Sequence, residues 1–176
     1  AKANRIREAM RSGEIPEDIA VKIQEGYQGL MRKLGNSDVP VAVRSSATAE
    51  DLPGASFAGQ QDTFLNQRGI PQVMEAVKGA WISLYGDRAV AYRNQQAAKG
   101  ELKDNPFRHG QVKMGVVVQR MVPAVAAGVA FTVDPATGDP AIVITANYGL
   151  GESVVSGQVT PDRWIFTSGE PVELLG

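Results

Sequence analysis

One continuous segment, residues 41–66, constrains the fold of this chain more than any other part of it. It reads VAVRSSATAEDLPGASFAGQQDTFLN: an apolar run leads to Arg44, a loop of small residues follows, and an extended run begins at Thr63. Glycine lets a backbone approach a ligand closely, and a guanidinium supplies a rigid fork of donors. The segment therefore predicts two strands joined by a phosphate-gripping loop, with Arg44, Gly54 and Gly59 as contacts. An ordinary surface loop, with Arg44 in a surface ion pair, has the same composition.

The whole string resembles the ATP-binding domain of the phosphotransferases that use phosphoenolpyruvate. These include phosphoenolpyruvate synthase, rifampicin phosphotransferase and, more distantly, pyruvate phosphate dikinase. The resemblance covers nearly all of residues 41–166, whereas the part before about residue 35 matches only loosely. It implies an α+β fold of the ATP-grasp type, an antiparallel sheet with flanking helices, of which this chain is a partial domain. We expect residues 1–108 to form a first lobe with the phosphate-gripping loop, and residues 109–176 a second lobe with the adenine linker and antiparallel strands.

Composition excludes several classes of protein. A formal net charge of −1 gives no overall basic field for nucleic acid or an anionic membrane. The absence of cysteine removes disulfides, thiolate metal sites and a cysteine nucleophile. No apolar stretch is as long as a membrane span, and the polar start is unlike a signal peptide. We therefore expect a cytoplasmic protein that binds neither nucleic acid nor membrane, and both ends look like cuts within a longer polypeptide.

Helical periodicity appears on both sides of the central segment. We expect helices over residues 4–10, from Pro16 to Gly35, and from Pro71 onward. The apolar stripes of the last two helices are more typical of a core than of a binding surface. These stripes are Ile19, Ile23, Tyr27, Leu30 and Leu34, and Val73, Val77, Ala80, Trp81 and Leu84.

Asp87 follows a glycine and can cap a further helix, which places Arg88 in the first turn. A cation is unfavourable there unless an anion is near. A salt bridge with an acidic neighbour is one explanation. The family resemblance favours another, because an arginine at this position resembles one that reaches the phosphates of ATP. On that basis Arg44 and Arg88 are the predicted catalytic residues.

The only histidine, His109, lies in a polar connector, residues 97–111. The resembled enzymes carry a phosphoryl group on a histidine, but that histidine has a Thr-Ser-His setting on a separate swivelling domain. His109 lacks this setting, and we interpret it as a loop residue.

A β-prone run, residues 112–121, ends shortly before Pro123. In ATP-grasp proteins the strand that leads to the interlobe linker offers backbone N–H and C=O groups to the adenine edge. The resemblance makes this run the adenine linker, whereas a buried strand with an exposed end fits the same residues. The candidate adenine contacts are Gln119, Arg120, Met121 and Val122.

Two apolar runs, residues 128–133 and 141–146, flank a group of turn formers and predict an antiparallel pair of strands. The following block, YGLGESVVSG at residues 148–157, resembles a segment of the same family in which an acidic residue lies near the ribose and phosphates. The glycines before Glu152 allow it to approach a ligand closely. Glu152 could hold a sugar hydroxyl, a metal-bound water or an arginine, or could be a plain turn residue.

The resemblance implies that ATP and Mg²⁺ are the cofactors. ATP would phosphorylate a histidine on a carrier domain of the same polypeptide, which would deliver the phosphoryl group to pyruvate or another acceptor. Arginines and Mg²⁺ would neutralise charge on the transferring group. The Mg²⁺ ligands are expected beyond Gly176, so no metal ligand is predicted here, and the chain alone is expected to be inactive.

Three interpretations remain open. The chain is the ATP-binding part of a phosphoenolpyruvate synthase-like enzyme (pyruvate, water dikinase), or of a rifampicin phosphotransferase-like enzyme, or a non-catalytic nucleotide-binding scaffold. The string AGVAFTVDPATGD leans slightly towards the second. The nucleotide interpretation requires that Arg44, Arg88, Gln119 and Glu152 face one common cleft.

Overall fold

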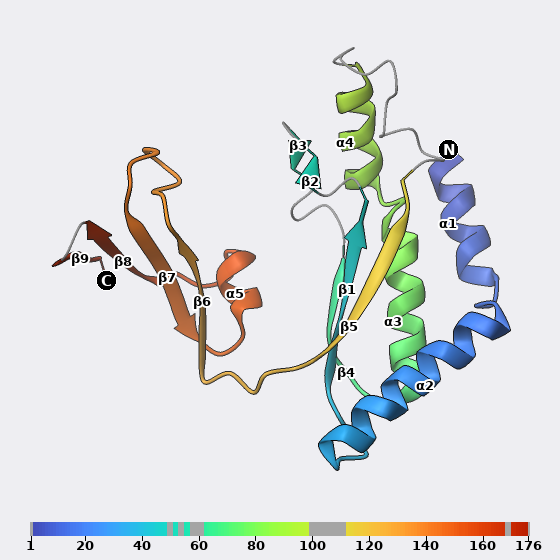
Figure 1. Cartoon of the computed structure of the whole chain (residues 1–176). Coiled ribbons are helices and arrows are strands. Elements are labelled where there is room, and N and C mark those ends of the chain that lie inside the picture. Colours follow the sequence, from blue (N-terminus) through green and yellow to red (C-terminus); the bar gives the residue numbers. More distant parts are fainter. Residues whose placement is uncertain are drawn as a thin grey trace. The chain divides into compact units, whose positions relative to one another are not determined.

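The computed structural model describes residues 2–48, 51–52, 55–56, 62–98, 112–167 and 170–175. Contacts divide the chain into two compact units, Ala1–Met121 and Val122–Gly176 (Figure 1). Both combine helices with antiparallel strands, so the chain is α+β, as predicted. The division falls later than the boundary expected between residues 108 and 109. The reason is that the strand expected to open the second lobe pairs within the first unit instead.

Helices and a three-stranded sheet build the first unit. Its described helices are α1 (Lys2–Ser12), α2 (Glu17–Leu34), α3 (Gly69–Ser83) and α4 (Asp87–Ala98). Its sheet has the antiparallel order β4-β1-β5, made of β1 (Val41–Ala47), β4 (Thr63–Gln67) and β5 (Met114–Arg120). Two short strands, β2 (Asp51–Leu52) and β3 (Ala55–Ser56), pair antiparallel with each other.

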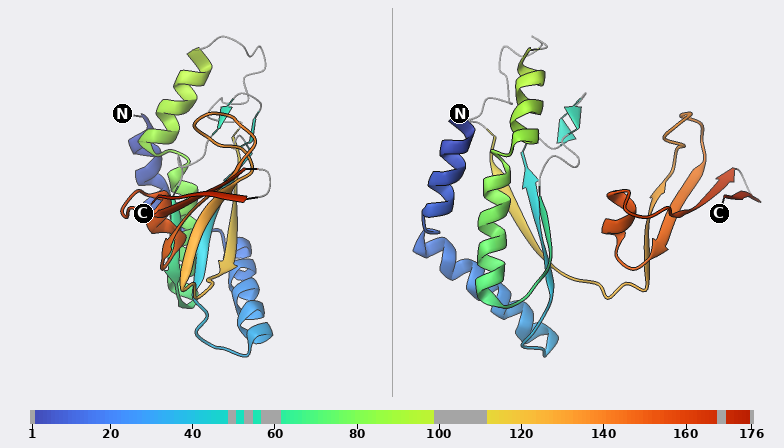
Figure 2. Two further views of the ribbon diagram at one scale, coloured as in Figure 1. Left: turned by 90° about the vertical axis from the view of Figure 1, so that its left-hand side faces the viewer. Right: turned by 180° about the vertical axis from the view of Figure 1, so that it is seen from behind.

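The core of the first unit lies between the sheet and the helices on one side of it, as the views in Figure 2 show. Alternate side chains of a strand point to opposite faces of its sheet, so Val41 and Val43 face the helices together. Both are fully buried against Tyr27 of α2 and Val73 of α3. The predicted apolar stripes of α2 and α3 are therefore confirmed as core, except that Ile19 is 37% exposed.

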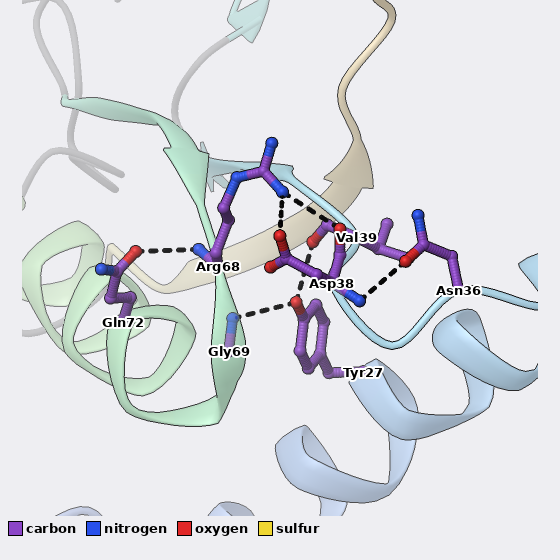
Figure 3. A network of polar contacts seen from close by, with 7 residues as sticks. All are labelled: Tyr27, Asn36, Asp38, Val39, Arg68, Gly69 and Gln72. Atoms are coloured by element: carbon purple, nitrogen blue, oxygen red, sulfur yellow. Dashed lines mark hydrogen bonds and ion pairs between the residues drawn. The ribbon is translucent and has the colours of Figure 1, made fainter.

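A polar network around Tyr27 fastens α2 to the rest of the first unit (Figure 3). The buried hydroxyl of Tyr27 donates to the carbonyl of Val39 at 2.8 Å and accepts the N–H of Gly69 at 3.0 Å. Beside it, Arg68 donates to the carbonyl of Asp38 at 3.1 Å and forms an ion pair with its carboxylate. One hydroxyl thus links α2 to the segment that precedes β1 and to the first residue of α3.

The join between α3 and α4 also holds α1. The guanidinium of Arg7 donates to the carbonyl of Tyr85 at 3.0 Å and to the carboxylate of Asp87 at 2.8 Å. The N–H of Val90 bonds to the carbonyl of Gly86 at 2.9 Å, which makes Gly86 the residue that caps α4. Asp87 is the first residue of the helix. The prediction of an Asp87 cap is wrong because its carboxylate is turned to Arg7.

A four-stranded antiparallel sheet forms most of the second unit, in the order β6-β7-β8-β9. Its strands are β6 (Ala126–Phe131), β7 (Ile142–Tyr148), β8 (Asp162–Thr167) and β9 (Glu170–Leu175), and a short helix, α5 (Gly151–Val155), packs on β6 and β7. The predicted antiparallel pair is β6 and β7. In the turn between them the N–H of Ala136 bonds to the carboxylate of Asp134 at 2.8 Å, which explains why turn formers occupy this stretch.

Candidate functional site

A row of three side chains crosses the sheet of the first unit on the face opposite the core. Arg44 of β1 is paired with Thr63 of β4 on one side and with Val117 of β5 on the other. Directly paired residues of neighbouring strands have Cβ atoms about 4.5–5.5 Å apart and share a face. Since Val43 points into the core, Arg44 points to the opposite face of the sheet. Its cross-strand partners Thr63 and Val117 point to that same face.

Arg44 is available to a ligand. Its side chain is exposed, and no hydrogen bond or ion pair joins it to another residue in the part of the chain that the structure describes. Val117 beside it is 51% exposed, which is unusual for a valine in the middle of a strand. A fork of donors next to a hydroxyl and an apolar surface suits a ligand that carries both an anionic and an apolar part.

The predicted adenine contacts are divided by the register of β5. Gln119 lies on the same face as Val117 and Arg44, because it is two residues from Val117 along the strand. Arg120 is paired with the core residue Val41, so its side chain leaves from the opposite face. The register therefore groups Gln119, and not Arg120, with the Arg44 row.

Some backbone groups of the predicted adenine linker are already hydrogen-bonded within the chain. The N–H of Met121 bonds to the carbonyl of Pro40 at 2.9 Å, and the carbonyl of Val122 accepts the N–H of Ala124 at 2.8 Å. The carbonyl of Met121 and the N–H of Val122 have no backbone partner among the described residues. These two adjacent groups, one acceptor and one donor, are the ones left for a ligand.

Arg88, in the first turn of α4, lies beside Asp62, the residue that precedes β4. Its guanidinium is 3.8 Å from the carboxylate of Asp62, and both side chains are largely exposed. Asp62 directly precedes Thr63, so Arg88 lies beside the strand end that carries one member of the Arg44 row. The acidic neighbour considered in the sequence is thus present. An exposed pair at this distance contributes little energy and can yield to a stronger anion.

The remaining predicted residues are distributed elsewhere. Glu152 is exposed in the first turn of α5, in the second unit, where Gly149 precedes it with a φ of 91° that glycine adopts without strain. Gly54, Gly59 and His109 lie outside the described residues. The expectation of one cleft shared by Arg44 and Glu152 therefore stays a prediction.

The sequence pattern does not reveal two members of the Arg44 row. It predicts only that Thr63 and Val117 lie in strands, yet both face the same side as Arg44. The period of two along each strand shows which residues share a face within one strand. The register between strands, which joins residues 44, 63 and 117 into one row, comes only from the structure.

The described residues do not fit a metal site of their own. Among them no three or more acidic or histidine side chains gather closely enough to hold a metal ion. In the same residues, no helix is long and apolar enough to cross a membrane. On the first unit, the candidate site is thus defined by the Arg44 row and the carbonyl of Met121.

Comparison with protein families matches residues 1–172 to the AMP/ATP-binding domain of pyruvate phosphate dikinase. The chain belongs to this family. Membership confirms the fold expected for the sequence, an α+β domain of the ATP-grasp type. It also gives the Arg44 row a context, because this family of domains is described as binding AMP and ATP.

Several curated proteins are similar to this member of the family. A probable phosphoenolpyruvate synthase of Methanothermobacter thermautotrophicus is 51% identical over 93% of the chain, which is 23% of the relative. The phosphoenolpyruvate synthases of Pyrococcus furiosus and Aquifex aeolicus are each 46% identical over 93% of the chain, or 19% and 18% of their own lengths. The chain thus spans about a fifth of the length of the curated relatives that it matches.

Proposed function

We propose that this chain is the ATP-binding part of a phosphoenolpyruvate synthase-like enzyme, a pyruvate, water dikinase that phosphorylates a carrier histidine on a separate domain of the same polypeptide. The observation that carries the proposal is the Arg44 row, whose three members are exposed on the face of the sheet opposite the core. The names of the similar proteins support the choice of acceptor, pyruvate. The names of these proteins give no support to a rifamycin acceptor, towards which the string AGVAFTVDPATGD leans slightly.

In this proposal the first unit holds the phosphates of ATP. The guanidinium of Arg44 donates to phosphate oxygens through its fork, and the hydroxyl of Thr63 adds a donor in the same row. Arg88, whose side chain is exposed beside Asp62, donates to a phosphate oxygen when ATP is bound. The Gly54 and Gly59 contacts remain predictions from the family resemblance.

The adenine end is assigned to the linker. The carbonyl of Met121 and the N–H of Val122 belong to one trans peptide and point in opposite directions, so a single adenine edge reaches only one of them. The amino group of adenine donates to the carbonyl of Met121, which has no backbone partner among the described residues. Val117 provides apolar surface for the base beside the phosphate-binding arginine, and the amide of Gln119 lies on the same face. Glu152 remains a predicted contact, tested by Glu152→Gln.

The role of these residues in the reaction is electrostatic. A nitrogen of the carrier histidine forms a bond to phosphorus while the bond to the leaving phosphate oxygen breaks, and negative charge moves onto that oxygen. Arg44 and Arg88 would stabilise this charge, as arginines do in phosphoryl transfer. Mg²⁺ would supply further charge neutralisation when bound to ATP, but the described residues offer it no ligand cluster, and we assign it no step. A cytoplasmic location is part of the same proposal.

The test uses the full-length enzyme that contains this chain and measures ATP-dependent phosphorylation of its carrier histidine. A charge-assisted hydrogen bond contributes about 1.5–3 kcal/mol, so Arg44→Ala should weaken ATP binding by roughly tenfold to a hundredfold. Arg44→Lys should recover part of the loss, because it restores charge without the fork. Arg68→Ala is the matched control: this arginine is also exposed but pairs with Asp38 away from the row. Unchanged phosphorylation in folded Arg44→Ala and Arg88→Ala variants would instead indicate a non-catalytic scaffold.

A further inference from the structure

A hollow of the first unit lies between α2 and β5, with a volume of about 480 Å³. It is lined by Lys22, Gly26, Gly29 and Lys33 of α2 and by Val116 and Val118 of β5. These two valines face the helix-covered side of the sheet, opposite to Val117. The hollow is therefore separate from the Arg44 row, and what it binds does not depend on the proposed function.

Gly26 and Gly29 of α2 line this hollow, and no contact among the described residues requires glycine at either position. Gly26 and Gly29 lie in the middle of a long helix, where glycine destabilises relative to alanine. A Cβ atom at Gly26 would meet nothing within 4 Å, and one at Gly29 would meet only the flexible end of Arg32, at 3.8 Å. Neither glycine has a positive φ. Their effect is to let another backbone approach the helix closely.

The other wall of the hollow is the edge of a sheet. In the order β4-β1-β5, strand β5 has a neighbour on one side only among the described residues. The outer N–H and C=O groups of such a strand are a template for pairing with a further strand. A strand added at this edge would turn alternate side chains towards Val116, Val118 and α2, which is where the hollow lies.

Charge at the two ends of the hollow limits what can enter it. Lys22 and Lys33 are the first and last residues of α2 that line it. Their separation along the helix is about 16 Å, the length of an extended strand of roughly five residues. A second copy of the chain paired through its own β5 would bring the same lysines against them, so like charges disfavour that occupant. An acidic residue near each end of the strand suits both lysines.

We propose that the hollow between α2 and β5 receives a β-strand of about five residues, apolar at alternate positions and acidic at both ends. The strand pairs with the outer edge of β5 and comes from another part of the same, longer polypeptide. The curated relatives support this source, because about four fifths of their length lies outside the match to this chain. The strand completes the sheet whose opposite face carries Arg44.

The test uses the 176-residue chain and a fluorescein-labelled synthetic peptide, Glu-Thr-Val-Thr-Val-Thr-Glu, whose valines and glutamates share one face of the strand, with fluorescence anisotropy as the readout. We expect saturable binding and slower amide hydrogen exchange along β5. A peptide with lysine at both ends should bind at least about tenfold more weakly, as should one with proline at its centre, because proline cannot donate to the ladder. Equal binding of all three peptides, or none by the first, would overturn the proposal.

Variants of the hollow give a sharper test. Gly26→Leu fills the open space, and we expect it to keep or raise the melting temperature while lowering affinity for the probe at least about tenfold. Gly26→Ala serves if the leucine variant does not fold. The double variant Lys22→Glu, Lys33→Glu should reverse the preference, so that the lysine-ended peptide binds more tightly. Lys113→Glu, at another exposed lysine, should leave the preference unchanged. A folded glycine variant with undiminished binding would exclude a strand in this hollow.

The source of the strand is tested separately. The full-length protein should not bind the probe, since its own strand already fills the hollow. Binding as tight as that of the 176-residue chain would overturn the assignment to the same polypeptide. Light scattering of the chain without the probe tests for a second copy as the occupant. A dimer in which the β5 amides exchange slowly with no probe present would identify that second copy and overturn the proposal.

Discussion

The hydroxyl of Tyr27 offers the most exact test of how the first unit is held together. Tyr27→Phe keeps the buried ring and removes one oxygen, which serves the carbonyl of Val39 and the N–H of Gly69. Tyr27 and Val39 are each 2% exposed, so water does not replace the lost partner of that carbonyl. Leaving a buried polar group unsatisfied costs about 1–3 kcal/mol, and Gly69 adds a smaller amount because it is only half-buried.

We therefore expect Tyr27→Phe to lower the free energy of unfolding by about 2–4 kcal/mol and the melting temperature by roughly 5–12 °C. The measurement is chemical and thermal denaturation followed by circular dichroism. Tyr148→Phe is the control, since that side chain is 81% exposed and should change stability by less than about 0.5 kcal/mol. A Tyr27→Phe variant as stable as the parent would refute the reasoning, because it would mean that these groups find other partners at no cost.

Three further substitutions test other parts of the chain. Gly79→Ala places a Cβ 2.6 Å from the ring of Phe64, so we expect about 1–3 kcal/mol of destabilisation in denaturation experiments, partly recovered by Phe64→Leu. Gly128→Ala places a Cβ against the backbone oxygen of Thr145 in the neighbouring strand, and should unfold the second unit first, seen as an early change in the fluorescence of its tryptophan. The hydrogen bond and charge of Arg7 hold the pKa of Asp87 below its ordinary value, so this pair stabilises the chain above that ordinary value and loses its effect as pH falls through the lowered one. Arg7→Gln should therefore lower the melting temperature near about pH 7 but not near about pH 2, and an equal loss at both would contradict the assignment.

The sequence by itself determined the elements of this fold and the family to which it belongs. The apolar period of α2, the proline before it and Gly35 after it are local signals, and the helix follows them. The apolar run before Arg44 predicted a strand, although β1 continues through Arg44 to Ala47, where a loop was expected. The turn formers after residue 133 predicted the β6-β7 pair. The unbroken string of residues 41–66 indicated the family, because so long a match fixes both residue types and their spacing.

Only the tertiary structure decided which of these residues meet. A strand pattern shows which side chains share a face of one strand, but the partner strand and the register depend on contacts between segments far apart in sequence. For that reason the sequence missed the row of Thr63, Arg44 and Val117. The resemblance offered the backbone groups of residues 119–122 to adenine, and only the structure shows that the N–H of Met121 bonds to the carbonyl of Pro40. Local propensity specifies the elements; packing between them selects the atoms that remain available to a ligand.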